Sequence, residues 1–399
     1  MHTSLSPTLS PLGEREQTLS PNRSIVIVGS GLAGYTLLKE IRKRDAAVPV
    51  TLVTADDGAF YSKPSLSNAL AAGKTAAALA SAGAEKMAAE QNATVLTHTR
   101  VTAIDTQRQR IHSDGGELEY RQLVLALGAD PIPHGLAGSG AADVLMVNDL
   151  ADYAAFRGAI DGKKRITVLG GGLIGCEFAN DLAHAGFAVD VVHLGGWPLE
   201  RLLPIEAGRR LADSLAMLGV RWHFGRTGKS VEAAANGYQV VLDNGEVIEA
   251  DVVLSAIGLR PRTQLAQTAD IPVGRGIQAD RLLQTGTANV YAIGDCVEIE
   301  GLNLPYVQPL MAQARALAAT LTGTPTAVAY PAMPVMVKTP AHPVAVLPPK
   351  AGAAGGWKVE CGDTGVCALH TDGSGRLQGF VLTGGETGRR NALVRELAA

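Results

Sequence analysis

Three glycines near the amino terminus, Gly29, Gly31 and Gly34, have the GxGxxG spacing that can hold a pyrophosphate against the start of a helix. They directly follow the β-branched run 25–28 and precede an apolar pattern of helical period. The first glycine permits a tight turn, the second lets phosphate approach the backbone, and the third lets helix and strand pack closely. Free N–H groups and the positive end of the helix dipole then face the phosphates. This strand–turn–helix context favours dinucleotide binding over an ordinary βα turn.

The same spacing occurs a second time, at Gly170, Gly172 and Gly175, again after an apolar strand (166–169) and before a helical pattern. Two chance occurrences of this glycine spacing in one chain, each between a strand and a helix, are far less expected than a single one. The repeat therefore predicts an internal duplication of βαβ units, with two nucleotide sites.

The two units differ where an acid is expected for a ribose hydroxyl, about 20 residues after the glycines. In the first unit the second strand (50–54) is followed by Ala55 and Asp56. In the second unit the strand 188–192 is followed by His193, and no arginine comes next to receive a 2′-phosphate. The sequence therefore gives only a weak preference for NAD over NADP.

Three charged residues are candidates for contacts to a bound ligand. Lys63, in a proline-containing loop beyond two strands, is either a solvated loop lysine or a charge held against the ligand. Asp295, at the end of the apolar strand 288–293, can accept a hydrogen bond from a ligand hydroxyl, or it can form a helix N-cap or an Asx turn. Lys338 is the one charge in an apolar run and is either a second ligand contact or a surface lysine with a buried stem. A helix predicted over 309–321 can stabilise negative charge at its amino end.

Composition limits the class of protein. The 399 residues are 46% hydrophobic and 18% charged, with a net charge of −3, which indicates a folded globular chain without general attraction to nucleic acid. The four cysteines form no CxxC pair, which argues against a zinc cluster or disulfide scaffold and fits a reducing cytoplasm. No apolar run is long enough to span a membrane.

The order of the elements predicts an α/β fold with two Rossmann-like units and a small C-terminal α/β lobe. We expect a Ser- and Pro-rich disordered tail at 1–23. The first nucleotide unit should comprise 24–147 and 258–330, interrupted by the second unit at 148–257, with the lobe at 331–399. The Ala-rich stretch 68–92 is predicted to be helical.

Together these features resemble the two-dinucleotide-binding-domain flavoprotein oxidoreductases over residues 24–399. Five segments look most like the rubredoxin–NAD(+) reductases of that family, namely 61–64, 170–181, 258–263, 294–296 and 337–340. The resemblance implies FAD as prosthetic group, NADH as reductant and rubredoxin, a small iron–sulfur protein, as electron acceptor.

The resemblance also implies individual site residues. Those implied for FAD are Gly29, Ser30, Gly31, Leu32, Ala33, Ala55, Asp56, Lys63, Val101, Glu177, Asp295, Val307 and Lys338. Those implied for NAD are Gly170, Gly172, Leu173, Ile174 and Gly175. By the same resemblance Lys63 and Glu177 should pair beside flavin N5, as the catalytic residues. A purely structural ion pair is the alternative. No residue is assigned to a metal.

The cysteine pattern separates branches of the family. Disulfide reductases carry a cysteine pair in the loop after the first FAD unit, and peroxide- or oxygen-reducing relatives carry one, whereas 61–68 has none. The resemblance then implies hydride transfer from NADH to flavin N5 and single electrons to rubredoxin, without a thiol relay.

Three other functions stay open. One is reduction of a [2Fe–2S] ferredoxin in an oxygenase system, with the same fold and cofactors. A second is reduction of a small molecule, as by a nitrite reductase flavin subunit or an NADH oxidase, against which the missing loop cysteine counts. A third is a signalling or nucleic-acid-binding flavoprotein, against which the balanced charge counts.

Overall fold

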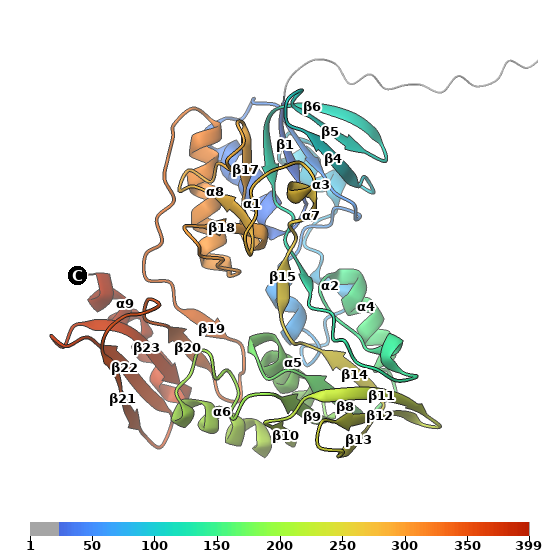
Figure 1. Cartoon of the computed structure of the whole chain (residues 1–399), viewed down its shortest axis with the longest axis vertical. Coiled ribbons are helices and arrows are strands. Elements are labelled where there is room, and N and C mark those ends of the chain that lie inside the picture. The colour runs from blue at the N-terminus through green and yellow to red at the C-terminus, as the bar shows by residue number, and fades with distance from the viewer. Residues whose placement is uncertain (1–23, 399) are drawn as a thin grey trace, which may run out of the picture.

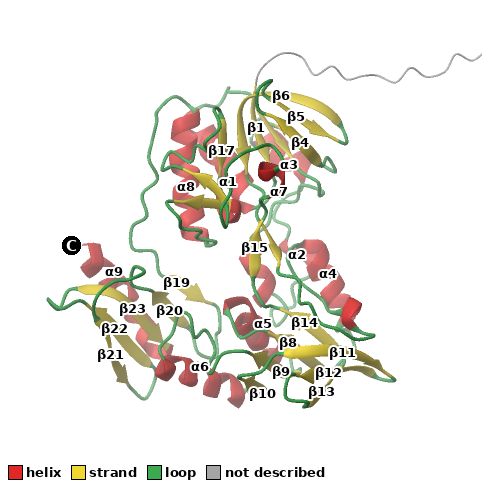
Figure 2. Cartoon of the chain, viewed as in Figure 1, coloured by secondary structure: helices red, strands yellow, loops and turns green. Residues whose placement is uncertain are grey.

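The computed structural model describes residues 24–398, so the tail expected at 1–23 lies outside the described residues. Two α/β units lie one above the other along the long axis, and a β-rich lobe lies beside the second (Figure 1). Coloured by secondary structure, each unit shows a strand layer with helices against it (Figure 2).

The first unit is built on a parallel sheet in which residues 24–28, 50–53, 123–125 and 290–292 are all buried, as is typical of strands covered on both faces. Its strands are β1 (Ser24–Val28), β2 (Val50–Val53), β3 (Thr94–Leu96), β6 (Gly116–Leu125) and β17 (Val290–Ala292). The spatial order is β3-β2-β1-β6, and β17 pairs with residues 123–125 at the carboxyl end of β6, on the edge opposite to β1. The long β6 also forms an antiparallel meander with β4 (Val101–Asp105) and β5 (Arg110–Ser113). Helices α1 (Leu32–Arg44) and α8 (Val307–Leu321) pack against each other beside the sheet. Smaller elements are α3 (Ala84–Glu90), α7 (Gln264–Gln267), β16 (Ile277–Ala279), η3 (Gly294–Cys296) and β18 (Val297–Ile299).

The second unit repeats this plan with the order β10-β9-β8-β14. Its parallel strands are β8 (Arg165–Leu169), β9 (Ala188–His193), β10 (Val220–Phe224) and β14 (Val252–Ser255). Its meander is β11 (Gly228–Ala234), β12 (Gly237–Leu242) and β13 (Val247–Ala250), and its helices are α4 (Leu150–Ala159), α5 (Leu173–His184) and α6 (Ile205–Met217), with the short η2 (Ala141–Asp143). The predicted duplication is therefore confirmed. The chain passes between the units through the antiparallel pair β7 (Ala129–Pro131) and β15 (Leu259–Pro261).

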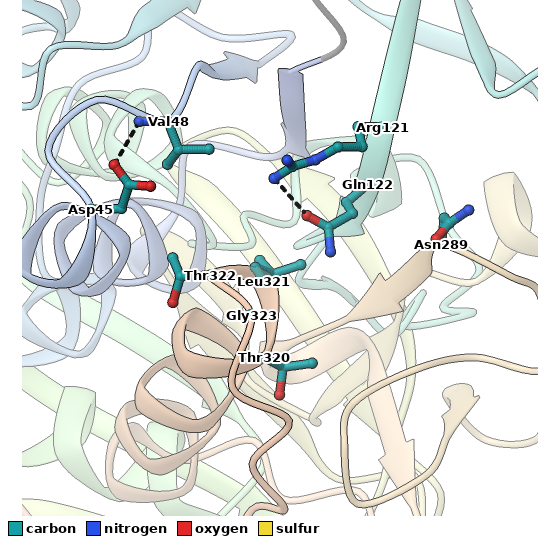
Figure 3. A pocket seen from close by; sticks show the side chains of 9 residues that line it. All are labelled: Asp45, Val48, Arg121, Gln122, Asn289, Thr320, Leu321, Thr322 and Gly323. Carbon is teal, nitrogen blue, oxygen red and sulfur yellow. Dashed lines mark hydrogen bonds between the residues drawn. The ribbon is translucent and has the colours of Figure 1, made fainter.

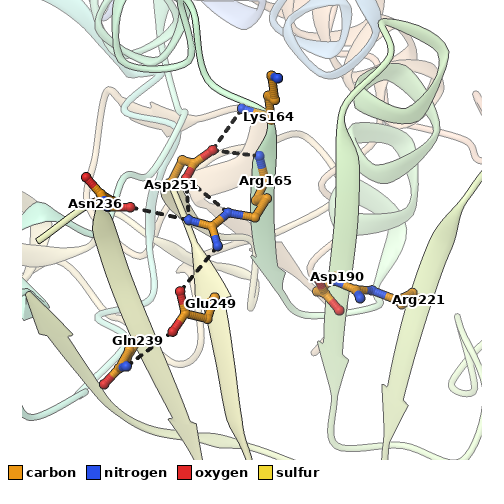
Figure 4. Close-up of polar contacts among 8 residues, drawn as sticks. All are labelled: Lys164, Arg165, Asp190, Arg221, Asn236, Gln239, Glu249 and Asp251. Carbon is orange, nitrogen blue, oxygen red and sulfur yellow. Dashed lines mark hydrogen bonds and ion pairs between the residues drawn. The ribbon is translucent and has the colours of Figure 1, made fainter. Parts of the chain in front are cut away.

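A charged network joins the strands of the second unit (Figure 4). Arg165, at the start of β8, pairs with Asp251 at 2.7 Å and with Glu249 at 3.2 Å. Although burial opposes it, the hydrogen bonds from Arg165 and from the Lys164 and Arg165 amides lower the pKa of Asp251 to about 2. The network thus links the start of β8 to β13 and to the residue that precedes β14.

The helix predicted over 68–92 is mostly absent. The segment contains the end of the 3₁₀ turn η1 (Lys63–Asn68), then α2 (Ala76–Leu79) and α3. Gly73 has a φ of +66°, which ends any helix there, and Gly83 caps the start of α3. Alanine content favoured a helix, but the glycines and a single-turn segment between them override that propensity.

The C-terminal lobe is an antiparallel sheet of order β19-β20-β23-β22-β21, covered on one face by α9 (Arg390–Ala398). Its strands are β19 (Val335–Val337), β20 (Val344–Leu347), β21 (Gly356–Cys361), β22 (Val366–Thr371) and β23 (Leu377–Thr383), followed by η4 (Gly384–Arg389). The other face shares one apolar core with the second unit, where Val346 and Val381 pack in the same cluster as Leu211 of α6. The lobe and the second unit are therefore joined by continuous packing. Within 24–398 no helix is both long and apolar enough to cross a bilayer.

Candidate active site

The first glycine loop has the geometry that its spacing predicts. Gly29 has a φ of +115°, and a Cβ there would lie 2.3 Å from the Ala126 carbonyl oxygen. A Cβ on Gly34 would lie 1.9 Å from the Gly29 carbonyl oxygen, so only glycine lets α1 approach β1 this closely. A Cβ on Gly31 would meet nothing within 4 Å, which leaves room over the helix start. This cradle fits a pyrophosphate.

The surroundings of that cradle also suit a dinucleotide. The start of α1 has no side-chain cap and no acid in its first turn, so its amide groups and dipole are available to an anion. Asp56 lies beyond β2 and accepts hydrogen bonds on Oδ1 from the Ser30 hydroxyl (2.9 Å), the Thr54 hydroxyl (2.6 Å) and the Gly58 amide (2.9 Å). Within residues 24–398, Oδ2 has no such bond. It is therefore available to a ribose hydroxyl.

The second glycine loop reproduces the first. A Cβ on Gly170 (φ +108°) would lie 2.5 Å from the Ala256 carbonyl oxygen, and one on Gly175 would lie 1.8 Å from the Gly170 carbonyl oxygen. A Cβ on Gly172 would meet nothing within 4 Å. Leu173 and Ile174 form the uncapped first turn of α5. The second loop is therefore a second anion cradle of the same shape.

His193 occupies the position of the missing acid in the second unit. Its Nδ1 accepts a hydrogen bond from the Gly171 amide at 3.1 Å, and its Nε2 lies 3.1 Å from the Trp197 carbonyl oxygen. Because a carbonyl only accepts, Nε2 carries the proton. Burial lowers the pKa of His193, although the nearby Glu200 carboxylate opposes this. The ring is therefore a neutral spacer between the glycine loop and the loop after β9.

Lys63 and Asp295 approach the first cradle from η1 and η3. A Cβ on Gly294 would lie 2.8 Å from the Ala33 Cβ, so Asp295 is next to the start of α1. Burial lowers the pKa of Lys63 and raises the pKa of Asp295, and each charge opposes the shift of the other. Among the described residues, neither side chain has a hydrogen bond or an ion pair. Both groups can therefore contact polar atoms of a bound cofactor.

The expected pair between Lys63 and Glu177 is wrong. Glu177 is 1% exposed, and its carboxylate pairs with the Lys338 ammonium group at 2.8 Å. The Lys338 amide (2.9 Å) and the Ser67 hydroxyl (2.5 Å) also donate to it. The Lys338 ammonium group donates in addition to the Pro64 carbonyl oxygen. The 3₁₀ turn η1 presents Pro64 and Ser67 to α5, whereas Lys63 at its start lies in the field of Asp295.

Two further polar residues of α5 were not predicted. Asp181 accepts hydrogen bonds from the Leu70 and Ala71 amides at 2.8 and 3.0 Å, and burial raises the pKa of its carboxyl group. Asn180 accepts one from the Ala341 amide at 3.2 Å. Helix α5 thereby ties the loop after η1 and the C-terminal lobe to the second unit. The available signal was that both residues lie within segment 170–181, which carries part of the family resemblance.

The remaining expected FAD contacts are spread over the first unit. Leu32 and Ala33 form the first turn of α1, and Ala55 is exposed directly beyond β2. Val101 begins β4, and Val307 begins α8, where it is 40% exposed. The start of α8 has neither a side-chain cap nor an acid in its first turn, so its dipole is unopposed.

No cysteine is placed as a redox relay beside these groups. Cys176 and Cys296 are fully buried, and burial raises the pKa of both thiols, that of Cys296 to about 11. Cys361 and Cys367 lie in the C-terminal lobe, and all four thiols are free. A buried thiol with a raised pKa is a poor nucleophile.

Figure 3 shows a surface pocket on the first unit. It is formed at the carboxyl ends of α1 and α8, by residues that include Asp45, Arg121 and Leu321. The glycine loop lies at the opposite end of α1. The pocket is therefore separate from the nucleotide cradles.

Comparisons with known proteins agree with this geometry. Residues 23–319 match the family described as pyridine nucleotide-disulphide oxidoreductase, and residues 327–397 match the rubredoxin binding C-terminal domain. The chain is 49% identical to the rubredoxin-NAD(+) reductase of Alcanivorax borkumensis, over 94% of this chain and 98% of that protein. It is 44% identical to the rubredoxin-NAD(+) reductase of Acinetobacter baylyi, over 94% and 97%.

Among solved structures, the ferredoxin reductase for the CYP199A2 system of Rhodopseudomonas palustris is 26% identical. It superposes with a TM-score of 0.83 over 90% of this chain and 91% of that one. The chain belongs to the pyridine nucleotide-disulphide oxidoreductase family and, within it, to the rubredoxin-NAD(+) reductases.

Proposed function

We propose that this protein is an FAD-dependent NADH:rubredoxin oxidoreductase. The observation that carries the proposal is the match of the C-terminal lobe to a rubredoxin-binding domain, on a chain with two pyrophosphate cradles. The two cradles account for a resident dinucleotide and a reducing one, and the lobe accounts for the acceptor. The free cysteines favour a reducing compartment, the cytoplasm.

The first unit fits FAD. The cradle from Gly29 to Ala33 would hold the pyrophosphate, and Asp56 would accept a hydrogen bond from the adenosine ribose. Asp295 would accept one from a ribityl hydroxyl. The start of α8, with Val307, would lie where it stabilises negative charge on the isoalloxazine ring. When bound, FAD supplies the conversion between two-electron hydride chemistry and one-electron transfer.

The second unit fits NADH. Gly170, Gly172 and Gly175, with the amides of Leu173 and Ile174, would hold its pyrophosphate. The enzyme then needs the nicotinamide and the isoalloxazine ring to meet between the two units.

The charged residues between the units have different roles. Lys63 is proposed as the catalytic ammonium group that contacts the flavin, because its side chain is free of any partner within 24–398 and its charge is partly desolvated. Glu177 orients Lys338 through the contacts described above, and Lys338 is the second lysine proposed to contact FAD. An unpaired carboxylate at this depth would be costly, so the pair also holds η1 in position.

Electrons are proposed to leave the flavin directly. Both cysteines of the nucleotide units, Cys176 and Cys296, are buried with raised thiol pKa values, so neither suits thiol exchange. Direct single-electron transfer suits a one-iron carrier.

Stopped-flow absorbance tests this function. The purified holoenzyme should lose flavin absorbance on mixing with NADH, and rubredoxin should restore it much faster than air does. Equal reoxidation by rubredoxin and by air would overturn the proposal.

The second candidate is reduction of a [2Fe–2S] ferredoxin. It is favoured by the likeness to the Rhodopseudomonas palustris ferredoxin reductase, whose match covers most of both chains. The same experiment separates the two, because a ferredoxin reductase would reoxidise faster with a [2Fe–2S] ferredoxin than with rubredoxin.

A further inference from the structure

The second nucleotide unit has no acid at the position from which a carboxylate binds the adenosine ribose. His193 stands there instead and cannot accept hydrogen bonds from the ribose hydroxyls. Both ring nitrogens of His193 are engaged, one with the Gly171 amide and one with the Trp197 carbonyl. No donor or acceptor of the ring is left for the two hydroxyls of a ribose. Recognition of the ribose must come from elsewhere in the loop.

The loop after β9 folds back onto the glycine loop. The Leu199 amide donates to the Gly171 carbonyl oxygen at 2.9 Å, and the Trp197 indole donates to the Leu203 carbonyl oxygen at 2.9 Å. Leu199 has a φ of +58°, which reverses the chain at this point. The next residue, Glu200, is thereby brought close to the end of β9.

The Glu200 carboxylate is held over the first residues of this loop. Its Oε2 accepts a hydrogen bond from the Gly196 amide at 3.1 Å, and a Cβ on Gly195 would lie 2.3 Å from its carboxylate carbon. Within the described part of the chain, Oε1 has no hydrogen bond and Glu200 forms no ion pair. The side chain is exposed, so a ligand can reach the carboxylate.

Two cations lie near the same position. The Arg226 amide donates to the His193 carbonyl oxygen, and the Arg226 guanidinium donates to the Gly225 carbonyl oxygen at 3.3 Å. Arg201 follows Glu200 directly and is exposed. These arginines would attract a 2′-phosphate, whereas the Glu200 carboxylate would repel it.

We propose that Glu200 accepts hydrogen bonds from the 2′ and 3′ hydroxyls of the adenosine ribose and so selects NADH over NADPH. The inference rests on the proposed NADH site of the second unit. In this proposal the acid that binds the ribose is not at the end of β9 but in the loop after it. His193, at the end of β9, supports that loop through its two hydrogen bonds.

Equilibrium binding to the holoenzyme tests the assignment without any turnover. We would titrate ADP-ribose, 2′-deoxy-ADP-ribose and 2′-phospho-ADP-ribose by calorimetry into the wild type, Glu200→Gln and the control Glu206→Gln, an exposed acid at the start of α6. The glutamine can still accept from the Gly196 amide, so the loop should persist.

The wild type and Glu206→Gln should bind the deoxy analogue about 10-fold more weakly than ADP-ribose, since a hydroxyl bond to a charged acceptor is lost. Glu200→Gln should bind ADP-ribose about 10-fold more weakly than the wild type, with little further loss for the deoxy analogue. Its affinity for the 2′-phosphorylated analogue should rise. Unchanged discrimination in Glu200→Gln would overturn the role of Glu200 alone. Failure of the wild type to bind ADP-ribose would overturn the NADH site as well.

Discussion

The two nucleotide units have the same strand order and nearly the same glycine geometry, and two of the side-chain positions at which they differ bear on their function. Asp56 follows the second strand of the first unit, whereas His193 ends that of the second. Two residues after the third glycine, α1 has Thr36 where α5 has Glu177. The shared backbone accounts for phosphate binding. The differing side chains account for the other contacts of each unit. In the second unit, Glu177 of α5 accepts hydrogen bonds from η1 and from the Lys338 amide near the C-terminal lobe.

The largest effect should come from the third glycines. Gly34→Ala and Gly175→Ala each place a methyl group within 2 Å of a backbone oxygen, so each should lower the free energy of unfolding by about 3 kcal/mol. Gly34→Ala should also lose FAD, whereas Gly175→Ala should keep FAD and lose reduction by NADH. Denaturant titration and the ratio of flavin to protein absorbance measure both effects.

Gly158→Ala in α4 is the matched control, because its Cβ would meet nothing within 4 Å. It should be neutral or stabilising by up to about 1 kcal/mol. Loss of FAD from Gly175→Ala as complete as from Gly34→Ala would contradict the assignment of one nucleotide to each unit.

The next effect concerns the buried carboxylate that only α5 carries. Glu177→Thr gives α5 the residue of α1 and should cost about 2–3 kcal/mol, because the Lys338 amide and ammonium group lose their acceptor. The Lys338 side chain is 36% exposed, so water limits the loss. Thermal unfolding at neutral pH measures it. Glu206→Thr should change stability by less than about 0.5 kcal/mol, and an equal loss in both variants would rule out the buried contact as the cause.

The strand-end difference can be removed by His193→Asp. The aspartate can accept from the Gly171 amide with one oxygen and from a ribose with the other, as Asp56 is placed to do. In this variant, Glu200→Gln should cost less ADP-ribose affinity than it does in the wild type, by about 1 kcal/mol. Calorimetry on the four proteins of the cycle gives this coupling, and strict additivity would contradict a shared hydroxyl.

The smallest effect is a difference in acid stability. The Asp251 pKa is about 2 when folded and about 3.9 when unfolded, so its contribution is present above pH 4 and lost as the pH falls toward 2. Arg165 is 36% exposed, and we therefore expect only about 1 kcal/mol. In the first unit the residue that corresponds to Arg165, five positions before the first glycine, is the uncharged Ser24, whose hydroxyl lies 3.4 Å from that of Thr51.

Tryptophan fluorescence follows this difference, because Trp197 and Trp222 both lie in the second unit. Arg165→Gln should reduce the pH dependence of unfolding between pH 4 and 2. A pH profile identical to that of the wild type would show that the network contributes nothing to acid stability.

The sequence predicts most of the frame because strand, glycine turn and helix are local signals. The duplication, the helix at 309–321 and the antiparallel C-terminal strands all have periodic or turn patterns that tertiary contacts reinforce. The helix predicted over 68–92 failed because alanine propensity is weak against two glycines and contacts with α5. The partner of Glu177 could not be predicted either, since two lysines were available and the turn of η1 decides which one reaches it. The use of both nitrogens of His193 likewise depends on a loop without a periodic signal.

The common core of the C-terminal lobe and the second unit limits how this chain can be re-engineered. Val337, Val344 and Val346 are buried against residues of the second unit, so a chimaera cut near residue 331 would carry an unmatched apolar surface. Transplanting the lobe to change the choice of electron carrier would require its facing side chains on α6 to be exchanged with it.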